Sequence, residues 1–217
     1  MDITEAARYL TRGREATEEL LRSLRETGDA LERAVTPRLT YRVLRRTPEG
    51  CEGIALPGED VRALLKDADR VIAAACTLGE AAARFIRRAF ASDAAKGVMA
   101  DACASALADG EMARFEKEMT LRYREAGLYL TDRFSPGYGD LPLTAQKDIC
   151  AALDAEKRLG LRVNGSMLLV PEKSVTAVIG ICPVPQRHRA IDEAGGCRGC
   201  AAFGSCEFQR QGRTCHG

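Results

Sequence analysis

The stretch TDRFSPGYGDLP, residues 131–142, divides a chain whose remaining pattern is mostly helical. Its two glycines and two prolines do not suit a helix interior or a central strand, so the backbone there must be irregular. The stretch presents Arg133 and Tyr138 beside Gly137. A guanidinium can bind a carboxylate through two hydrogen bonds, and a phenol ring can face a flat ring or a cation. We therefore predict that this loop binds a small ligand that has a carboxylate, a ring and a positive centre. The alternative is a structural turn with an exposed arginine.

Helical and strand patterns on both sides of this loop predict the fold class. Helical spacing or composition marks residues 3–34 (as two helices), 59–66, 80–91, 94–125 and 144–158. Segments rich in β-prone or buried residues are 39–45, 51–56, 69–79, 161–163, 167–170 and 174–181. Strands near both ends with long helices between them predict an α+β fold, with a mostly antiparallel sheet and long flanking helices.

Composition limits the classes of partner and compartment. The 217 residues carry a formal net charge of +1, which gives no reason to expect nucleic acid or an anionic membrane as a partner. No long apolar run occurs, and the N-terminus is acidic and amphipathic instead of basic and then apolar. We expect a cytoplasmic protein. In a reducing compartment its nine cysteines are expected to be buried thiols or metal ligands before disulfides.

The composition changes at residue 183, which suggests two units. Residues 1–182 are predicted to form the α+β domain, and residues 183–217 a small cysteine-rich appendage that is basic, glycine-rich and poor in apolar residues. Four thiols fall within this appendage: Cys197, Cys200, Cys206 and Cys215. Because thiolates bind zinc and iron–sulfur clusters, we predict that these four hold one or the other. Cys182 and His216 are alternatives to Cys215, and an unstructured tail or a redox-active pair is the alternative to a metal site.

The remaining cysteines and the candidate carboxylates lie in the predicted domain. Four cysteines on apolar faces are expected to be core residues: Cys51, Cys76, Cys103 and Cys150. Glu111 follows Gly110 late in the long helix, where a carboxylate could hold an ammonium group or ribose hydroxyls. Its simpler interpretation, which the residues alone favour, is a solvated side chain paired with Arg114 or Lys117. Asp101 sits among small apolar residues, either buried with a partner or at the helix edge.

Several segments together resemble one known family. They are residues 73–79 (AAACTLG), residues 101–105 (DACAS) leading to Glu111, residues 133–138 (RFSPGY) and residues 171–176 (PEKSVT). This set is similar to the activation, or reactivation, domain of cobalamin-dependent methionine synthase in its short stand-alone form. Arg-x-x-x-Gly-Tyr is the most specific of these motifs. The resemblance covers residues 1–182 and implies a twisted, mostly antiparallel sheet with flanking helices.

The resemblance also implies a ligand and a role. By it, Arg133 binds the methionine carboxylate of S-adenosylmethionine, Tyr138 and the backbone near Gly137 line the site, and Glu111 matches a carboxylate that contacts the cofactor. The family's domain supplies no nucleophile. This fits a chain with two histidines and no Ser-His-Asp set or P-loop, so we predict no catalytic residue.

Departures from the family pattern point to a partner protein. The chain has no Asp-x-His-x-x-Gly motif, so cobalamin is expected only through a partner, a corrinoid-binding methionine synthase or methyltransferase subunit. The segment between Glu111 and Arg133 is shorter than in the long enzymes, and the cysteine tail is foreign to them. The expected function is an accessory protein that binds S-adenosylmethionine and supports reductive methylation of that corrinoid. The alternative is a non-catalytic sensor or scaffold with a zinc-stabilised tail.

Overall fold

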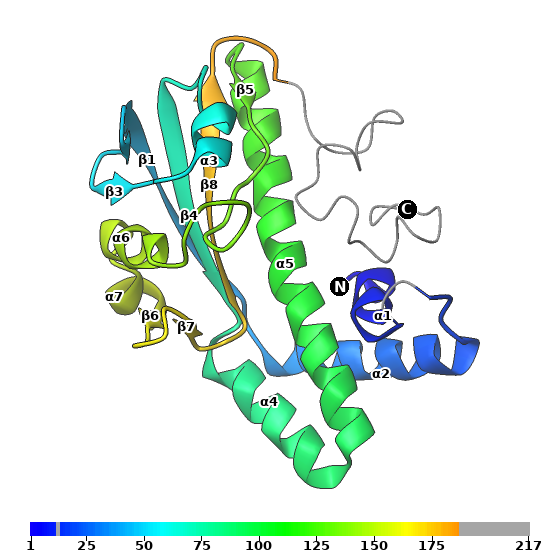
Figure 1. The fold of residues 1–217 in the computed structure, drawn as a ribbon. Helices are drawn as coiled ribbons and strands as arrows, with labels where there is room; N and C mark the ends of the chain where they lie inside the picture. Colours follow the sequence, from blue (N-terminus) through cyan, green and yellow to red (C-terminus); the bar gives the residue numbers. More distant parts are fainter. Residues whose placement is uncertain (12–13, 187–217) are drawn as a thin grey trace.

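The computed structural model describes residues 1–11 and 14–186, and its centre is a six-stranded antiparallel sheet (Figure 1). The strand order is β3-β2-β1-β4-β8-β5. These strands are β1 (Arg38–Thr47), β2 (Gly50–Cys51), β3 (Ile54–Ala55), β4 (Arg70–Thr77), β5 (Tyr129–Leu130) and β8 (Ser174–Cys182). The hairpin of β6 (Arg162–Val163) and β7 (Leu169–Val170) forms a separate small sheet. The predicted α+β class with a mostly antiparallel sheet is confirmed.

The two strands at the middle of the sheet are buried along nearly their whole length. β4 pairs with β1 from Arg38↔Thr77 to Arg45↔Arg70, and with β8 from Arg70↔Ile181 to Thr77↔Ser174. Every residue of β4 after Arg70 is buried, which explains why its sequence is a continuous apolar run instead of an alternating one. The strand predicted at residues 69–79 is thus confirmed.

Helices cover both faces of this sheet and also form a bundle beyond one end of it (Figure 1). Their bounds are α1 (Ile3–Thr11), α2 (Glu18–Ala34), α3 (Glu59–Leu64), α4 (Gly79–Ser92), α5 (Ala94–Glu125), α6 (Ala145–Ala152) and α7 (Ala155–Leu159). The first half of α5 packs with α1, α2 and α4, and its second half lies on the sheet through Met112, Phe115 and Met119. α3, α6 and α7 cover the opposite face. Figure 1 shows α5 running along the whole length of the sheet.

Two predicted elements differ in the structure. The single helix expected over residues 144–158 is two helices, because Asp154 adopts a left-handed conformation with φ 51° and ends the continuous turn. The hairpin expected between residues 39–45 and 51–56 is short: only Arg46 and Thr47 of β1 pair with β2, and the long partner of β1 is β4. The Asn164-Gly165 hairpin does occur, between β6 and β7.

Five cysteines of the described ranges are free and buried. Cys51, Cys76, Cys103 and Cys150 lie in the core, as predicted, and Cys182 joins them at the end of β8. Within residues 1–11 and 14–186, no helix is both long and apolar enough to cross a membrane.

Candidate functional site

The loop after β5 is fastened to the outer edge of β8 on both sides of Arg133. Thr131 donates its N–H to the Gly180 carbonyl at 3.0 Å, and its hydroxyl accepts from the Gly180 N–H at 2.8 Å. Phe134 and Val178 exchange both backbone hydrogen bonds, at 2.9 and 2.8 Å. Because the residues on both sides of it are hydrogen-bonded to β8, the backbone of Arg133 is fixed at the edge of the sheet.

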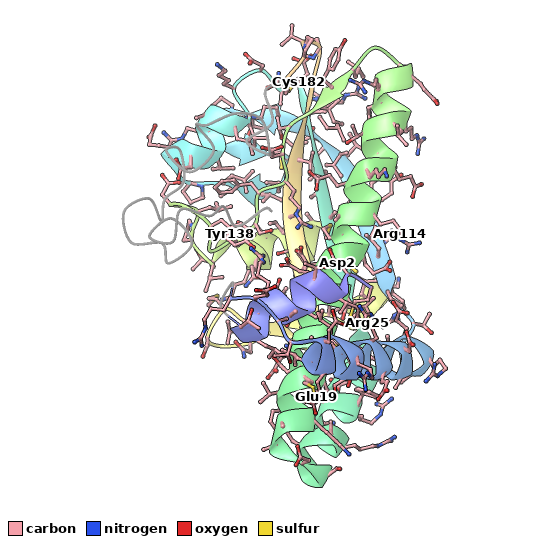
Figure 2. All side chains as sticks on the ribbon, turned by 90° about the vertical axis from the view of Figure 1, so that its right-hand side faces the viewer. Asp2, Glu19, Arg25, Arg114, Tyr138 and Cys182 are labelled. Atoms are coloured by element: carbon pink, nitrogen blue, oxygen red, sulfur yellow. The ribbon has the colours of Figure 1, made fainter. Side chains whose placement is uncertain are left out.

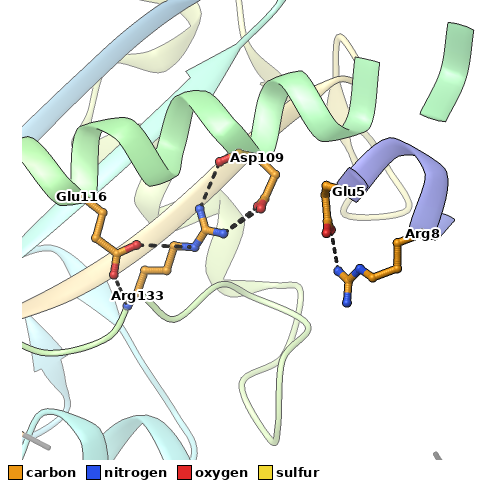
Figure 3. A network of polar contacts seen from close by, with 5 residues as sticks. All are labelled: Glu5, Arg8, Asp109, Glu116 and Arg133. Carbon is orange, nitrogen blue, oxygen red and sulfur yellow. Dashed lines mark hydrogen bonds and ion pairs between the residues drawn. The ribbon is translucent and has the colours of Figure 1, made fainter. Parts of the chain in front are cut away.

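The Arg133 side chain lies against two carboxylates of α5 (Figure 3). Its Nη2 donates to both carboxylate oxygens of Asp109, at 2.8 and 2.9 Å, and its Nη1 reaches the Asp109 carbonyl at 3.4 Å. Glu116 accepts from the Arg133 backbone N–H at 3.2 Å and lies 3.8 Å from Nε. Asp109 and Glu116 are seven residues apart, two helical turns, so both face the loop. The guanidinium that we predicted as a ligand contact is therefore already paired within the protein.

The tip of the loop is a tight turn that presents Tyr138 to solvent. Gly137 has φ 92°, and its N–H donates to the Leu141 carbonyl at 2.8 Å. A Cβ at this position would lie 3.0 Å from Leu143, so both the backbone angle and the space favour glycine. Tyr138 is 60% exposed. The predicted trio is thus in one loop, with Arg133 directed at α5 and Tyr138 exposed at the tip.

Asp140, which the sequence analysis did not select, joins this loop to α3. Its carboxylate accepts the backbone N–H of Glu59 at 2.5 Å and of Asp60 at 3.2 Å. It therefore caps the first turn of α3 from a distant part of the chain, a role that favours an acidic side chain. The sequence contains Gly139-Asp140 directly after Tyr138, but no local pattern indicates that Asp140 contacts Asp60, which lies 80 residues earlier.

Glu111 does not join Arg133. Two residues along a helix turn the side-chain direction by about 200°, so Glu111 and Asp109 point to different sides of α5. Glu111 pairs with Arg114, the simpler of its two predicted interpretations. Figure 2 shows Arg114 and Tyr138 on opposite sides of α5. Its assignment as a ligand contact stays a prediction.

Further polar residues line the same flank of α5 as Asp109. Lys173 lies 2.8 Å from the Asp101 carboxylate and donates to the Ser105 hydroxyl at 2.9 Å, so Asp101 has a partner. α1 packs beside this flank. Burial raises the pKa of Tyr9 to about 12, with further contributions from the nearby carboxylates of Glu5 and Asp109. The flank therefore holds more negative than positive groups around Arg133.

A separate hollow lies away from this loop. An open cavity of about 610 Å³ is bordered by α6, α7 and β6, with Lys147, Asp154, Glu156 and Arg162 among its lining residues. None of the predicted site residues borders it. We place the candidate site at the loop because the fixed polar groups converge there, whereas the hollow is wide and open to solvent.

The predicted metal ligands Cys197, Cys200, Cys206 and Cys215, and the alternative His216, lie outside the described residues. In the part of the chain that the structure does describe, no three His, Cys, Asp or Glu side chains are grouped to hold a metal ion. Cys182 is fully buried in β8, and burial raises the pKa of its thiol to about 11. It would have to leave the core to act as a ligand in place of Cys215.

Comparison with known proteins supports the fold. No protein-family model and no curated protein matches this sequence. A solved structure, the MetH reactivation domain bound to AdoHcy, is similar with a TM-score of 0.59 and 17% sequence identity, over 85% of this chain and 77% of that chain. A likeness at this identity is one of fold. It agrees with the architecture that the sequence resemblance implied.

Proposed function

We propose that the chain binds S-adenosylmethionine at the 131–142 loop and supports reductive methylation of a corrinoid held by a separate protein. One observation carries this proposal: Arg133 is fastened to the sheet edge and aimed at α5, in a fold similar to a reactivation domain solved with AdoHcy. Gly137 and Tyr138 lie in the same loop and are assigned to the same ligand.

The pairing of Arg133 with Asp109 suggests how an amino-acid group would bind. A zwitterion carries a carboxylate and an ammonium next to each other. If it enters between Arg133 and Asp109, the guanidinium takes the carboxylate and Asp109 takes the ammonium, so neither protein charge loses its partner. The existing contact, with distances of 2.8 and 2.9 Å, would open on binding, and each of the two protein charges would exchange the other for a charge of the ligand. Glu116 would continue to hold the Arg133 backbone.

The chain's part in the reaction is to bind and orient. The sulfonium of S-adenosylmethionine is reactive by itself, so methyl transfer needs proximity and alignment more than an acid or a base. A corrinoid on the partner, reduced by one electron, would take the methyl group and leave the thioether. The exposed Tyr138 stands at the open side of the site, where a partner could approach. We assign no catalytic residue.

The appendage is given a supporting role in this proposal. Four thiols at residues 197–215 suit zinc or an iron–sulfur cluster, and a cluster would supply the electron that the reduction needs. Anaerobic purification followed by metal and sulfide analysis tests this role. Protein with zinc alone would remove the basis for electron transfer and favour a structural tail.

Calorimetric titration with S-adenosylmethionine tests the binding site. Arg133→Ala should weaken binding by about 1.5–3 kcal/mol, roughly 10- to 150-fold, because charge-assisted hydrogen bonds are lost. Arg88→Ala, at an exposed arginine of α4, is the matched control and should bind normally. 5′-Methylthioadenosine lacks the amino-acid group, so its affinity should be the same for both variants. Equal S-adenosylmethionine affinity in the wild type and Arg133→Ala would refute the site.

A methyl-transfer assay separates the two functional alternatives. The protein is incubated with S-adenosylmethionine, a reductant and a corrinoid-loaded methionine synthase subunit, and methylcobalamin is followed by its absorbance. Formation that depends on the chain and falls in Arg133→Ala supports the accessory role. Saturable ligand binding without any methyl transfer would favour the sensor or scaffold.

A further inference from the structure

The first eight residues of β1 form an open edge of the sheet. β2 pairs only with Arg46 and Thr47, so residues 38–45 have β4 on one side and no strand on the other among the residues that the structure describes. N–H and C=O groups of successive residues in an antiparallel strand point to alternate sides. Arg46 donates to Asp69 on the β4 side, and Arg45 exchanges hydrogen bonds with Glu52 on the outer side. Leu39, Tyr41 and Val43 therefore share the outward direction of Arg45.

These three outward residues have no backbone partner among residues 1–11 and 14–186. Their side chains lie on the α5 face of the sheet, because they pair with Cys76, Ala74 and Ile72 of the cluster under α5. α5 packs mainly over β4, β8 and β5 and touches the strip at its margin, where the Tyr41 ring lies 5.1 Å from the Phe115 ring and the Tyr41 hydroxyl accepts from Arg122 at 3.5 Å. The strip is therefore only partly covered: Tyr41 is 36% and Val43 38% exposed. β1 thus combines unpaired backbone groups with an apolar strip, a surface that pairs readily with another strand.

The arginines of β1 limit the registers in which a second copy of this chain can pair with this edge. When a second copy pairs with this edge in antiparallel orientation, outward residues face outward residues only in every second register. The partner of Tyr41 is then another outward residue, such as residue 39, 41 or 43 of the copy. With Tyr41 opposite Tyr41 of the copy, Leu39 faces Val43, Arg42 faces Thr40 and Arg38 faces Leu44. All three outward residues then exchange hydrogen bonds, and no arginine faces an arginine.

The two neighbouring registers are less stable, because they pair arginines with each other and lose backbone hydrogen bonds. Shifting one way places Arg42 opposite Arg42 of the copy, and shifting the other way places Arg42 opposite Arg38. Like charges directly opposite are destabilising. The first shift also pairs Leu39 with Arg45, whose outer backbone groups Glu52 already occupies, and the second pairs Val43 with Pro37, where no N–H is available. In the proposed register Arg45 and Pro37 face each other instead, just outside the paired residues 38–44, so none of the three outward residues depends on either.

We propose that β1 is a self-association edge, at which two copies of this chain join their sheets in antiparallel fashion with Tyr41 on the two-fold axis. The apolar strip of Leu39, Tyr41 and Val43 is then covered by its own counterpart, between the two α5 helices. The contact is narrow, so the dimer forms reversibly and its population rises with protein concentration. This proposal does not depend on the ligand.

Cysteine cross-linking tests the register. In the proposed pair, the Cα atoms at position 41 are about 5.5 Å apart, within the range of a disulfide. Those at position 43 are offset by four residues, about 14 Å, which is too far. Tyr41→Cys under mild oxidation should therefore give a disulfide-linked dimer, identified by peptide mass spectrometry at that position, and Val43→Cys should not. Equal cross-linking of both variants, or of neither, would overturn the register.

Light scattering over a range of protein concentrations tests the association itself. The wild type should show a mass that rises from monomer toward dimer. Val43→Lys places a charge in the strip and should remain monomeric, whereas Val98→Lys, at a valine of α5 that is 47% exposed, should behave like the wild type. Circular dichroism checks that both variants are folded. A wild type that is monomeric at every concentration would refute the proposal. Protection of residues 39–43 from hydrogen exchange in such a monomer would show that another segment of the same chain covers this edge.

Discussion

The ion pair between Arg133 and Asp109 should stabilise the fold measurably. Its two hydrogen bonds of 2.8 and 2.9 Å run from one guanidinium nitrogen, Nη2, to the two carboxylate oxygens, and the side chains are only 23% and 35% exposed. Hydrogen bonds to charged groups contribute about 1.5–3 kcal/mol when buried, whereas exposed ion pairs contribute about 0.2–1 kcal/mol. Since this pair is partly exposed, we expect a coupling free energy of about 1–1.5 kcal/mol.

A double-mutant cycle measures this coupling. Urea unfolding of the wild type, Arg133→Ala, Asp109→Ala and the double variant gives the four free energies of unfolding. Arg133→Ala should be the more harmful single change, because it leaves both Asp109 and Glu116 without that cation.

A second cycle on Arg62 and Glu59 serves as the control. That pair has the same 2.8 Å separation but side chains that are 52% and 84% exposed, so its coupling should be about 0.3–0.5 kcal/mol. If the two cycles gave equal couplings, burial would not distinguish the pairs, and the argument that Arg133 is held firmly for a ligand would lose its basis.

Two further predictions concern the sheet. Gly180→Ala should lower the free energy of unfolding by about 1–3 kcal/mol, because a Cβ there would lie 2.9 Å from both Leu65 and Thr131 and 3.0 Å from Ala68; Gly165→Ala, with nothing within 4 Å, should change it by less than about 0.5 kcal/mol in the same urea titration. Burial raises the pKa of Cys76 from 9.0 to about 12, so the unfolded thiol ionises first, and its contribution to stability is complete below pH 9 and is lost between pH 9 and 12. Cys76→Ala should therefore reduce the alkaline fall of stability, by up to about 1.4 kcal/mol per pH unit, in urea midpoints measured at pH 8 and pH 10.5; an unchanged slope would contradict the assigned cause.

The sequence predicted the elements whose pattern is local. The apolar run of β4 and the helical composition of α5 required no knowledge of the rest of the chain, and both occur close to their expected limits. The break at Asp154 was missed because an aspartate in a left-handed conformation leaves no compositional mark comparable to that of proline or glycine.

The candidate site was only partly predictable, because it depends on which side of α5 faces the loop. Small residues surround the first half of this helix, so its sequence does not define one apolar face, and Glu111 could not be told apart from Asp109 by pattern. The seven-residue spacing of Asp109 and Glu116 was the available indication that two carboxylates share a side. Their shared partner, Arg133, follows only from the pairing of the loop with β8.

The position of β8 has a consequence for the order in which the protein is made. β8 is the last strand of the sheet, yet it is inserted between β4 and β5, and the Arg133 loop is hydrogen-bonded to its outer edge. During synthesis, β4 is made about a hundred residues before the strand that completes its pairing. The loop is translated earlier, but its hydrogen-bond partners in β8 are absent until Ser174–Cys182 has left the ribosome. A nascent chain that stops before residue 174 should therefore lack the completed sheet and the anchored Arg133 loop, and it should not bind the ligand proposed for that loop.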